Sequence, residues 1–146
     1  MRPFSSRKRD DRERRMQAVS RRENGAVRNR VEIRGHRLVA DEPEDEGGED
    51  SGPSPLELLA GSLASCTAIT MQMYADGKGW DIGEVVVGVD YQQASKGAPP
   101  RFELVVELPK EIPEEQRTRL MQIAAKCPVH RTLEGEVMFD ERLEIR

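Results

Sequence analysis

A nearly uncharged run from Gly52 to Gly79 constrains the fold of this chain more than any other feature. Ser54 is a favourable N-cap, Pro55 fits the first position of a helix, and Glu57 completes a capping box with Ser54. No charged residue follows Glu57 until the last turn, where the glycines of Gly77–Gly79 favour a helix end. The run therefore predicts one long helix over about 55–76 that is apolar on every side, and hence buried on every side.

Either a membrane or a protein core can bury such a helix. An uncharged run of about 18 residues is a candidate membrane span, but this one contains serine, threonine and glutamine and lacks a basic flank and an aromatic belt. Gly61, Ala64, Ser65 and Ala68 form a strip of small residues, which allows another backbone to approach closely. We therefore expect a core helix packed on a partner helix. Only 36% of the chain is apolar and 4% aromatic, which suggests that a second subunit supplies part of the burial.

Length and charge bound the remaining possibilities. The 146 residues are enough for one domain with a sizeable core, and the net charge of −4 gives no general case for nucleic-acid binding. Residues 1–15 are dense in arginine, aspartate and glutamate, so we expect a disordered basic tail before a folded domain over 16–146. Contact of this tail with nucleic acid is the weaker alternative. No apolar segment follows the basic N-terminus, so we expect a cytoplasmic protein with no membrane partner.

The order of the other predicted elements is that of an α+β domain. Alternating apolar residues predict strands, Asn24-Gly25 and Gly35-His36 predict turns, and Pro113 precedes a second helix whose apolar face ends at Cys127. The acidic stretch Asp41–Ser51 lacks the spacing of a calcium loop and is expected to be a solvated linker. The predicted strands cover residues 17–22, 27–33, 38–40, 85–91, 102–108 and 136–146, the last with Val137 and Phe139 pointing inward.

The two cysteines are the candidate reactive groups. Cys66 lies in the middle of the first helix and Cys127 at the end of the second. A single cysteine on an apolar helix face is usually a small buried hydrophobe. Two cysteines on helices that pack together also fit a dithiol mechanism, in which one thiolate attacks a peroxide and the other closes a disulfide. Burial raises the pKa of a thiol, and a nearby arginine offsets this cost; several arginines in the strands before the helix are candidates.

Other kinds of site are less well supported. Cys127 and His130 resemble half of a metal site, but two cysteines and two histidines at scattered spacing do not form a closed zinc site. The sequence contains no phosphate-binding glycine-rich loop and no nucleophile elbow. We therefore predict no metal and no cofactor, and we interpret His130 as a surface or hydrogen-bonded residue.

Two segments resemble the OsmC/Ohr family. Residues 52–80 (GPSPLELLAGSLASCTAITMQMYADGKGW) are similar to the central helix of that family, and CPVHRTL at 127–133 resembles its second-cysteine motif in the OsmC-like branch. The resemblance covers roughly residues 25–137. It implies an intertwined α+β homodimer, with sheets wrapped around two paired central helices. It also implies a thiol peroxidase that reduces organic hydroperoxides, with Cys66 peroxidatic and Cys127 resolving. A dithiol reductant would then recycle the disulfide.

The resemblance also bears on the groups around the first cysteine. The family places an activating arginine in the first hairpin, and Arg22 is the nearest match, with Arg21 and Arg28 as competitors. In the peroxidase branch a glutamate directly follows the proline at the start of the central helix, whereas this chain has Leu56 there and Glu57 one residue later. The alternative function is therefore a noncatalytic dimer of the same fold that binds an apolar small molecule or senses redox state.

Overall fold

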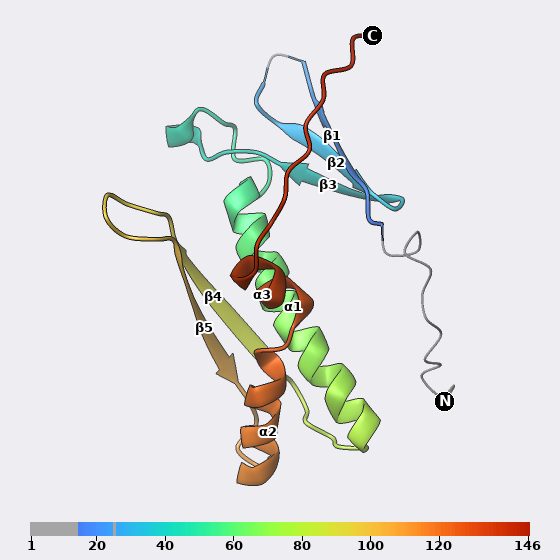
Figure 1. Cartoon of the computed structure of the whole chain (residues 1–146), viewed down its shortest axis with the longest axis vertical. Helices are drawn as coiled ribbons and strands as arrows, with labels where there is room; N and C mark the ends of the chain where they lie inside the picture. The colour runs from blue at the N-terminus through green and yellow to red at the C-terminus, as the bar shows by residue number, and fades with distance from the viewer. Residues whose placement is uncertain (1–14, 25) are drawn as a thin grey trace. The chain divides into compact units, whose positions relative to one another are not determined.

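A computed structural model describes residues 15–24 and 26–146 of the chain (Figure 1). The chain divides into two compact units, one ending at Pro55 and the other spanning Leu56–Arg146, and each unit is described by itself. The predicted basic tail, apart from Arg15, and Gly25 of the predicted Asn-Gly turn lie outside the described residues.

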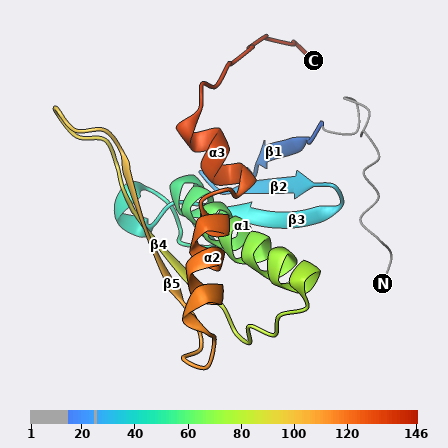
Figure 2. The ribbon, with the colours of Figure 1, turned by 60° about the horizontal axis from the view of Figure 1, so that its bottom comes forward.

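The N-terminal unit is a three-stranded antiparallel sheet in the order β1-β2-β3. Its strands are β1 (Ala18–Arg22), β2 (Asn29–Ile33) and β3 (His36–Ala40), which lie side by side in Figures 1 and 2. Arg34 and Gly35 link the last two strands with φ angles of 47° and 81°, the positive values that a tight two-residue hairpin loop requires. The three predicted strands are confirmed, although β3 begins two residues earlier than expected because this turn is so short.

The acidic loop after β3 is ordered, and the prediction of a solvated linker is wrong. Asp41 is buried, and its carboxylate accepts hydrogen bonds from the backbone N–H groups of Glu42, Glu49 and Ser51 and from the Ser51 hydroxyl. These bonds, led by those from Ser51, lower the pKa of Asp41 to about 2. A short 3-10 helix, η2 (Glu44–Glu46), lies inside the loop. A single well-placed carboxylate therefore organises a segment whose composition alone reads as solvent-exposed.

The long helix α1 (Pro55–Lys78) begins at the predicted proline. It ends at Gly79, whose φ of +70° is the left-handed conformation typical of a helix C-terminus. The expectation of burial on every side is wrong for the single chain. The buried side chains follow one stripe along the helix, while Ile69 is 57% and Met73 56% exposed; the stripe consists of Leu63, Thr67, Met71 and Ala75.

The strands β4 (Val86–Gln92) and β5 (Arg101–Glu107) form an antiparallel hairpin in the C-terminal unit. Burial alternates along both strands as the sequence predicts, with Val87 and Val89 on one strand and Phe102 and Leu104 on the other more buried than their neighbours. Side chains in a strand point alternately to its two faces. The hairpin therefore directs one apolar face toward the rest of its unit.

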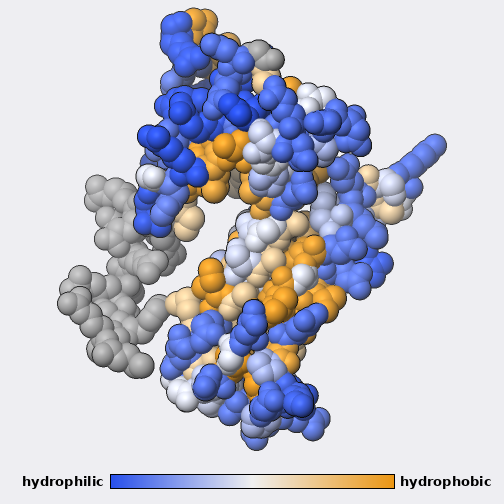
Figure 3. Space-filling model, turned by 180° about the vertical axis from the view of Figure 1, so that it is seen from behind, coloured by the Kyte–Doolittle hydropathy of each residue, from blue (hydrophilic) through white to orange (hydrophobic). Residues whose placement is uncertain are grey.

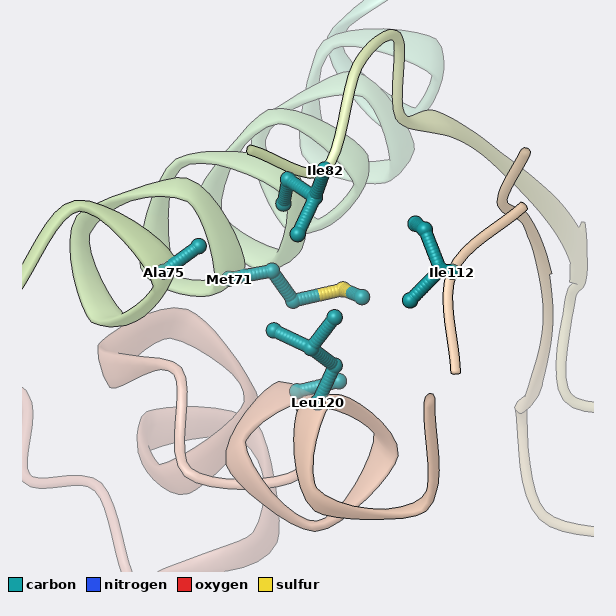
Figure 4. Packing of buried hydrophobic residues seen from close by; sticks show 6 residues of the cluster. Met71, Ala75, Ile82, Ile112 and Leu120 are labelled. Atoms are coloured by element: carbon teal, nitrogen blue, oxygen red, sulfur yellow. The ribbon is translucent and has the colours of Figure 1, made fainter. Parts of the chain in front are cut away.

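Two helices follow the hairpin, where the sequence predicts only one. The predicted helix is α2 (Glu114–Ala124), and an additional helix, α3 (Pro128–Glu134), begins directly after Cys127. The core of the unit forms where α1, α2 and the loops beside the hairpin meet. Figure 4 shows the apolar side chains of this core pointing toward one another; those labelled are Met71, Ala75, Ile82, Ile112 and Leu120.

The predicted final strand over 136–146 is wrong for the single chain. These residues have no regular secondary structure, and Val137 and Phe139 are exposed rather than inward, Phe139 by 82%. A strand needs a hydrogen-bonded neighbour, and alternation alone does not supply one. The segment therefore keeps the sequence pattern of a strand without its pairing.

Candidate functional site

Cys66 lies in the middle of α1, at the edge of the helix's buried stripe. It directly precedes the buried Thr67 and is itself partly exposed. The helix is continuous through this position, from Pro55 to Lys78, so the position of the thiol is set by a regular element. A small molecule can therefore approach this sulfur more readily than a fully buried one.

Cys127 occupies the junction between α2 and α3 and is fully buried. Pro128 disfavours a helical backbone at the residue before it, and Cys127 is extended with φ −62° and ψ 141°. Its side chain acts as the N-cap of α3, because Sγ accepts the backbone N–H of His130 at 3.3 Å. Pro128 restricts the backbone at Cys127 and thus also fixes the direction of the second thiol.

The structure brings the two cysteines together within the C-terminal unit. The Cys66 thiol lies near enough to the Cys127 thiol, the backbone N–H of Val129 and the Thr70 hydroxyl for each of them to shift its pKa. On the other side of the pair, Thr67 Oγ1 lies 3.8 Å from Cys127 Sγ. Both cysteines are free thiols. The arrangement is that of a dithiol pair held by two helices.

Burial raises the pKa of the Cys66 thiol above its usual range. The backbone N–H of Val129 acts in the opposite direction, and the neighbouring Cys127 thiol adds to the rise. A thiolate is the reactive form of cysteine, and burial disfavours it. A nearby positive charge would offset this effect by favouring the thiolate.

The predicted activating arginine, Arg22, belongs to the N-terminal unit. It is the last residue of β1, and its Nε donates to the Ala26 carbonyl at 2.8 Å. Its two competitors pair with carboxylates: Arg21 lies 3.6 Å from Glu32, and Arg28 binds Glu23. A carbonyl oxygen does not neutralise a guanidinium as a carboxylate does. Unlike its two competitors, Arg22 contacts a carbonyl and not a carboxylate, so it remains the arginine predicted to activate Cys66.

The sequence reasoning missed Thr67, Thr70 and Val129. Thr67 could have been found, because it is the one hydroxyl in the apolar stripe that repeats every four residues along α1. Val129 could not, because its backbone N–H matters only once α3 exists. His130 is hydrogen-bonded as expected: Nδ1 lies 3.0 Å from the Ala125 carbonyl and Nε2 2.9 Å from Glu134.

A separate cavity of about 800 Å³ opens between Trp80 and α2. Glu114, Arg119 and other polar side chains of α2 line it, and neither cysteine contributes to its described walls. Beside it, the Tyr74 hydroxyl accepts a hydrogen bond from Arg119 Nε at 2.9 Å. The cavity is thus distinct from the dithiol pair.

Two further observations concern other classes of site. Among the helices of residues 15–24 and 26–146, none combines the length and the apolar character needed to cross a bilayer. Over the same residues, histidine, cysteine, aspartate and glutamate side chains do not gather in threes in an arrangement that could hold a metal ion.

Comparison with solved structures identifies the same fold in several bacterial proteins. An OsmC-like protein from Mycoplasma pneumoniae has a TM-score of 0.71 at 20% identity, covering 83% of this chain and 88% of that one. The organic hydroperoxide resistance protein OhrB of Bacillus subtilis has a TM-score of 0.57 at 18% identity, covering 83% and 91%. An organic hydroperoxide resistance protein OsmC from Legionella pneumophila has a TM-score of 0.61 at 16% identity, covering 83% and 90%.

These likenesses bear on the fold alone, because the identities are low. No curated protein matches the chain. The model of the OsmC-like protein family, however, matches residues 48–142, a span that includes α1, both cysteines and α3. The match covers well over half of the chain and both segments on which the resemblance in the sequence rests. The chain belongs to the OsmC-like protein family.

Proposed function

We propose that this protein is a cysteine-based thiol peroxidase that reduces organic hydroperoxides. The observation that carries the proposal is the proximity of the Cys66 and Cys127 thiols within one unit, with Cys66 on α1 and Cys127 at the junction of α2 and α3. Relatives of the same fold are described as organic hydroperoxide resistance proteins, which favours an alkyl hydroperoxide over other oxidants as substrate. The difference in exposure supports the proposed roles: Cys66, which is partly exposed, would meet the substrate, and Cys127, which is buried, would react with its neighbour.

The proposed cycle has three balanced steps. The Cys66 thiolate attacks the outer oxygen of the hydroperoxide, the O–O bond breaks, and the leaving alkoxide takes a proton to give an alcohol. Cys66 is then a sulfenic acid, and Cys127 displaces its hydroxide to form a disulfide and water. A dithiol reductant attacks this disulfide and restores both thiols while it becomes a disulfide itself.

Mixing the protein with cumene hydroperoxide and a dithiol tests this cycle. The wild type should consume peroxide over many turnovers. Cys66→Ser should consume none beyond the uncatalysed background. Without the dithiol, Cys127→Ser should react once per chain and leave a sulfenic acid that dimedone traps, detected by intact mass. Equal inertness of the wild type and Cys66→Ser contradicts the proposal.

Arg22 is the proposed activator of Cys66. Its guanidinium would favour the thiolate that burial disfavours. Arg22→Gln should slow the reaction of Cys66 with peroxide roughly 100–1,000-fold, the range for loss of one preorganised donor at a reacting group. Arg21→Gln is the matched control, because Arg21 is the adjacent residue and pairs with Glu32. Equal rates for the two variants would remove Arg22 from the site.

A homodimer is the proposed assembly. The OsmC/Ohr family is generally homodimeric, and apolar side chains of α1, Ile69 and Met73 among them, remain exposed in the single chain. Figure 3 shows hydrophobic residues gathered at the surface of the single chain. The C-terminal segment adds exposed apolar side chains at every second position, with one interruption; these are Val137, Phe139, Leu143 and Ile145. Sedimentation analysis should give the mass of a dimer, and deletion of residues 136–146 should weaken dimerisation.

A noncatalytic dimer that binds an apolar small molecule or senses redox state is the second candidate. Two observations favour it: Leu56 occupies the position where the peroxidase branch has glutamate, and burial raises the pKa of Cys66. This function predicts a ligand-dependent rise in melting temperature, or one disulfide formed per chain without turnover. Sustained consumption of cumene hydroperoxide would exclude it.

A further inference from the structure

Thr67 is a buried hydroxyl that joins the two cysteine-bearing elements. It is 0% exposed and lies in the otherwise apolar stripe of α1. Its Oγ1 is 2.8 Å from the Leu63 carbonyl one turn back and 3.8 Å from Cys127 Sγ. A buried hydroxyl is costly unless it is hydrogen-bonded, and the Leu63 carbonyl already meets that need. The contact with sulfur is therefore additional to what folding of the helix requires.

The hydroxyl can serve the carbonyl and the sulfur in turn. A threonine hydroxyl has one hydrogen, which rotates to suit its partners, and two lone pairs. While Cys127 is a thiol, the Thr67 hydrogen points to the Leu63 carbonyl and the oxygen can accept S–H. When Cys127 loses its proton, the charged sulfur becomes the stronger acceptor, and rotation of the hydroxyl brings the hydrogen to it without moving either helix.

We propose that Thr67 is a positioning residue for the resolving step, holding Cys127 Sγ beside Cys66 and donating to its thiolate. This inference rests on the proposed peroxidase function. In the step itself, the Cys127 thiolate forms the S–S bond with Cys66 and the S–O bond of the sulfenic acid breaks. The departing hydroxide combines with the proton that Cys127 released and leaves as water, and the two electrons lost by the thiol pair are those taken up earlier by the peroxide.

The backbone complements this role. His130 N–H donates to the same sulfur from α3 at 3.3 Å, so Cys127 receives one fixed donor from its own segment and one rotatable donor from α1. The fixed donor sets the direction of the side chain. The rotatable donor, the Thr67 hydroxyl, can reorient when the sulfur becomes charged. Thr67 directly follows Cys66 in the chain.

The test follows disulfide formation in a single turnover. One equivalent of cumene hydroperoxide oxidises Cys66, and quenched samples are assayed by intact mass for sulfenic acid and disulfide. Thr67→Val keeps the shape and removes the hydroxyl, so it should slow disulfide formation roughly 10–150-fold, as expected for one lost bond to a charged sulfur. Thr67→Ser restores the hydroxyl and should stay within about threefold of the wild type. Ser62→Ala is the matched control, because it removes an exposed hydroxyl that bonds the Leu59 carbonyl of the same helix.

The oxidation of Cys66 provides the internal reference. In a Cys127→Ser background, Thr67→Val should react with hydroperoxide at the rate of its parent. Wild-type speed of disulfide formation in Thr67→Val overturns the inference, and so does equal slowing of the valine and serine variants, which would mean that packing and not the hydroxyl matters. Thr67→Ala serves as the hydroxyl-free variant if the valine chain does not fold.

A diazene oxidant separates failure of this inference from failure of the proposed function. Diamide adds to the Cys66 thiolate, and Cys127 then displaces the hydrazine to form the same disulfide. If hydroperoxide is not consumed by the wild type, the peroxidase proposal fails. Slower closure of the diamide-induced disulfide in Thr67→Val, rescued by serine, still supports the positioning role, and unchanged closure overturns it.

Discussion

Met71 and Met73 of α1 form a natural pair for testing how this helix is buried. They are the same residue type, two positions apart, yet Met71 is 0% and Met73 56% exposed in the single chain. Met71 packs in the core cluster with Leu120. Met71→Ala should therefore reduce the free energy of unfolding by about 2–5 kcal/mol, the range for truncating a buried methionine. If α1 faces only solvent on its other side, Met73→Ala should cost less than about 0.5 kcal/mol.

The proposed homodimer changes the expectation for Met73. Burying a full methionine side chain stabilises by about 1.5–3 kcal/mol, so burying the exposed half of Met73 and losing it to alanine corresponds to about 1 kcal/mol per subunit. Two subunits give about 2 kcal/mol, which weakens dimerisation roughly 30-fold. Met73→Ala should thus unfold at lower urea when the protein is dilute, whereas the loss in Met71→Ala should be large at every concentration.

Urea unfolding followed by circular dichroism, at protein concentrations spanning about two decades, measures both effects, and sedimentation analysis measures the dimer directly. Equal destabilisation of the two variants would refute the burial assignment along α1. A Met73→Ala chain that unfolds and dimerises like the wild type at all concentrations would refute α1 as part of the subunit interface.

Three further predictions test single contacts. Asp41→Asn should lower the melting temperature at pH 7; because the folded pKa of about 2 lies below the usual 3.8, the gap to the wild type should close as the pH falls from about 5 to 2. Arg119→Met should raise the pKa of Tyr74, which the hydrogen bond from Arg119 lowers, and the change is visible in tyrosinate absorbance. Gly79→Ala should destabilise by about 1 kcal/mol because φ is +70°, whereas Gly77→Ala inside the helix should stabilise by up to about 1 kcal/mol in urea unfolding.

Local patterns predicted the elements that their own residues determine. The capping residues and uncharged run located α1 from its first residue, and alternation located β4 and β5, because helix start signals and side-chain period are written in neighbouring positions. Pro128 correctly indicated that the chain leaves a helix near Cys127, but α2 ends earlier, at Ala124, and Cys127 lies outside it as the N-cap of α3.

The features that the sequence predicted wrongly depend on hydrogen-bond partners that are not neighbours in the sequence. Asp41 became the centre of an ordered loop because backbone N–H groups from Glu49 and Ser51 fold back onto it, which composition does not encode. The strand expected over 136–146 has the correct alternation but no paired neighbour in the single chain. The contact between Cys66 and the Val129 N–H arises only from the third helix. In each case the structure was determined by hydrogen bonding between residues that are not sequence neighbours, and not by local residue preference.

The unequal surroundings of the two thiols determine what can control this site. Cys127 is buried with a backbone donor in place, so its reactivity is set by its own unit once Cys66 is oxidised. Cys66 is partly exposed, and burial raises the pKa of its thiol, which disfavours the thiolate that the proposed first step needs. The proposed source of that charge, Arg22, lies in the N-terminal unit. A correctly folded pair of cysteines is then not sufficient for the proposed activity, and Arg22→Gln separates the two contributions, because it removes the charge and leaves the C-terminal unit unchanged.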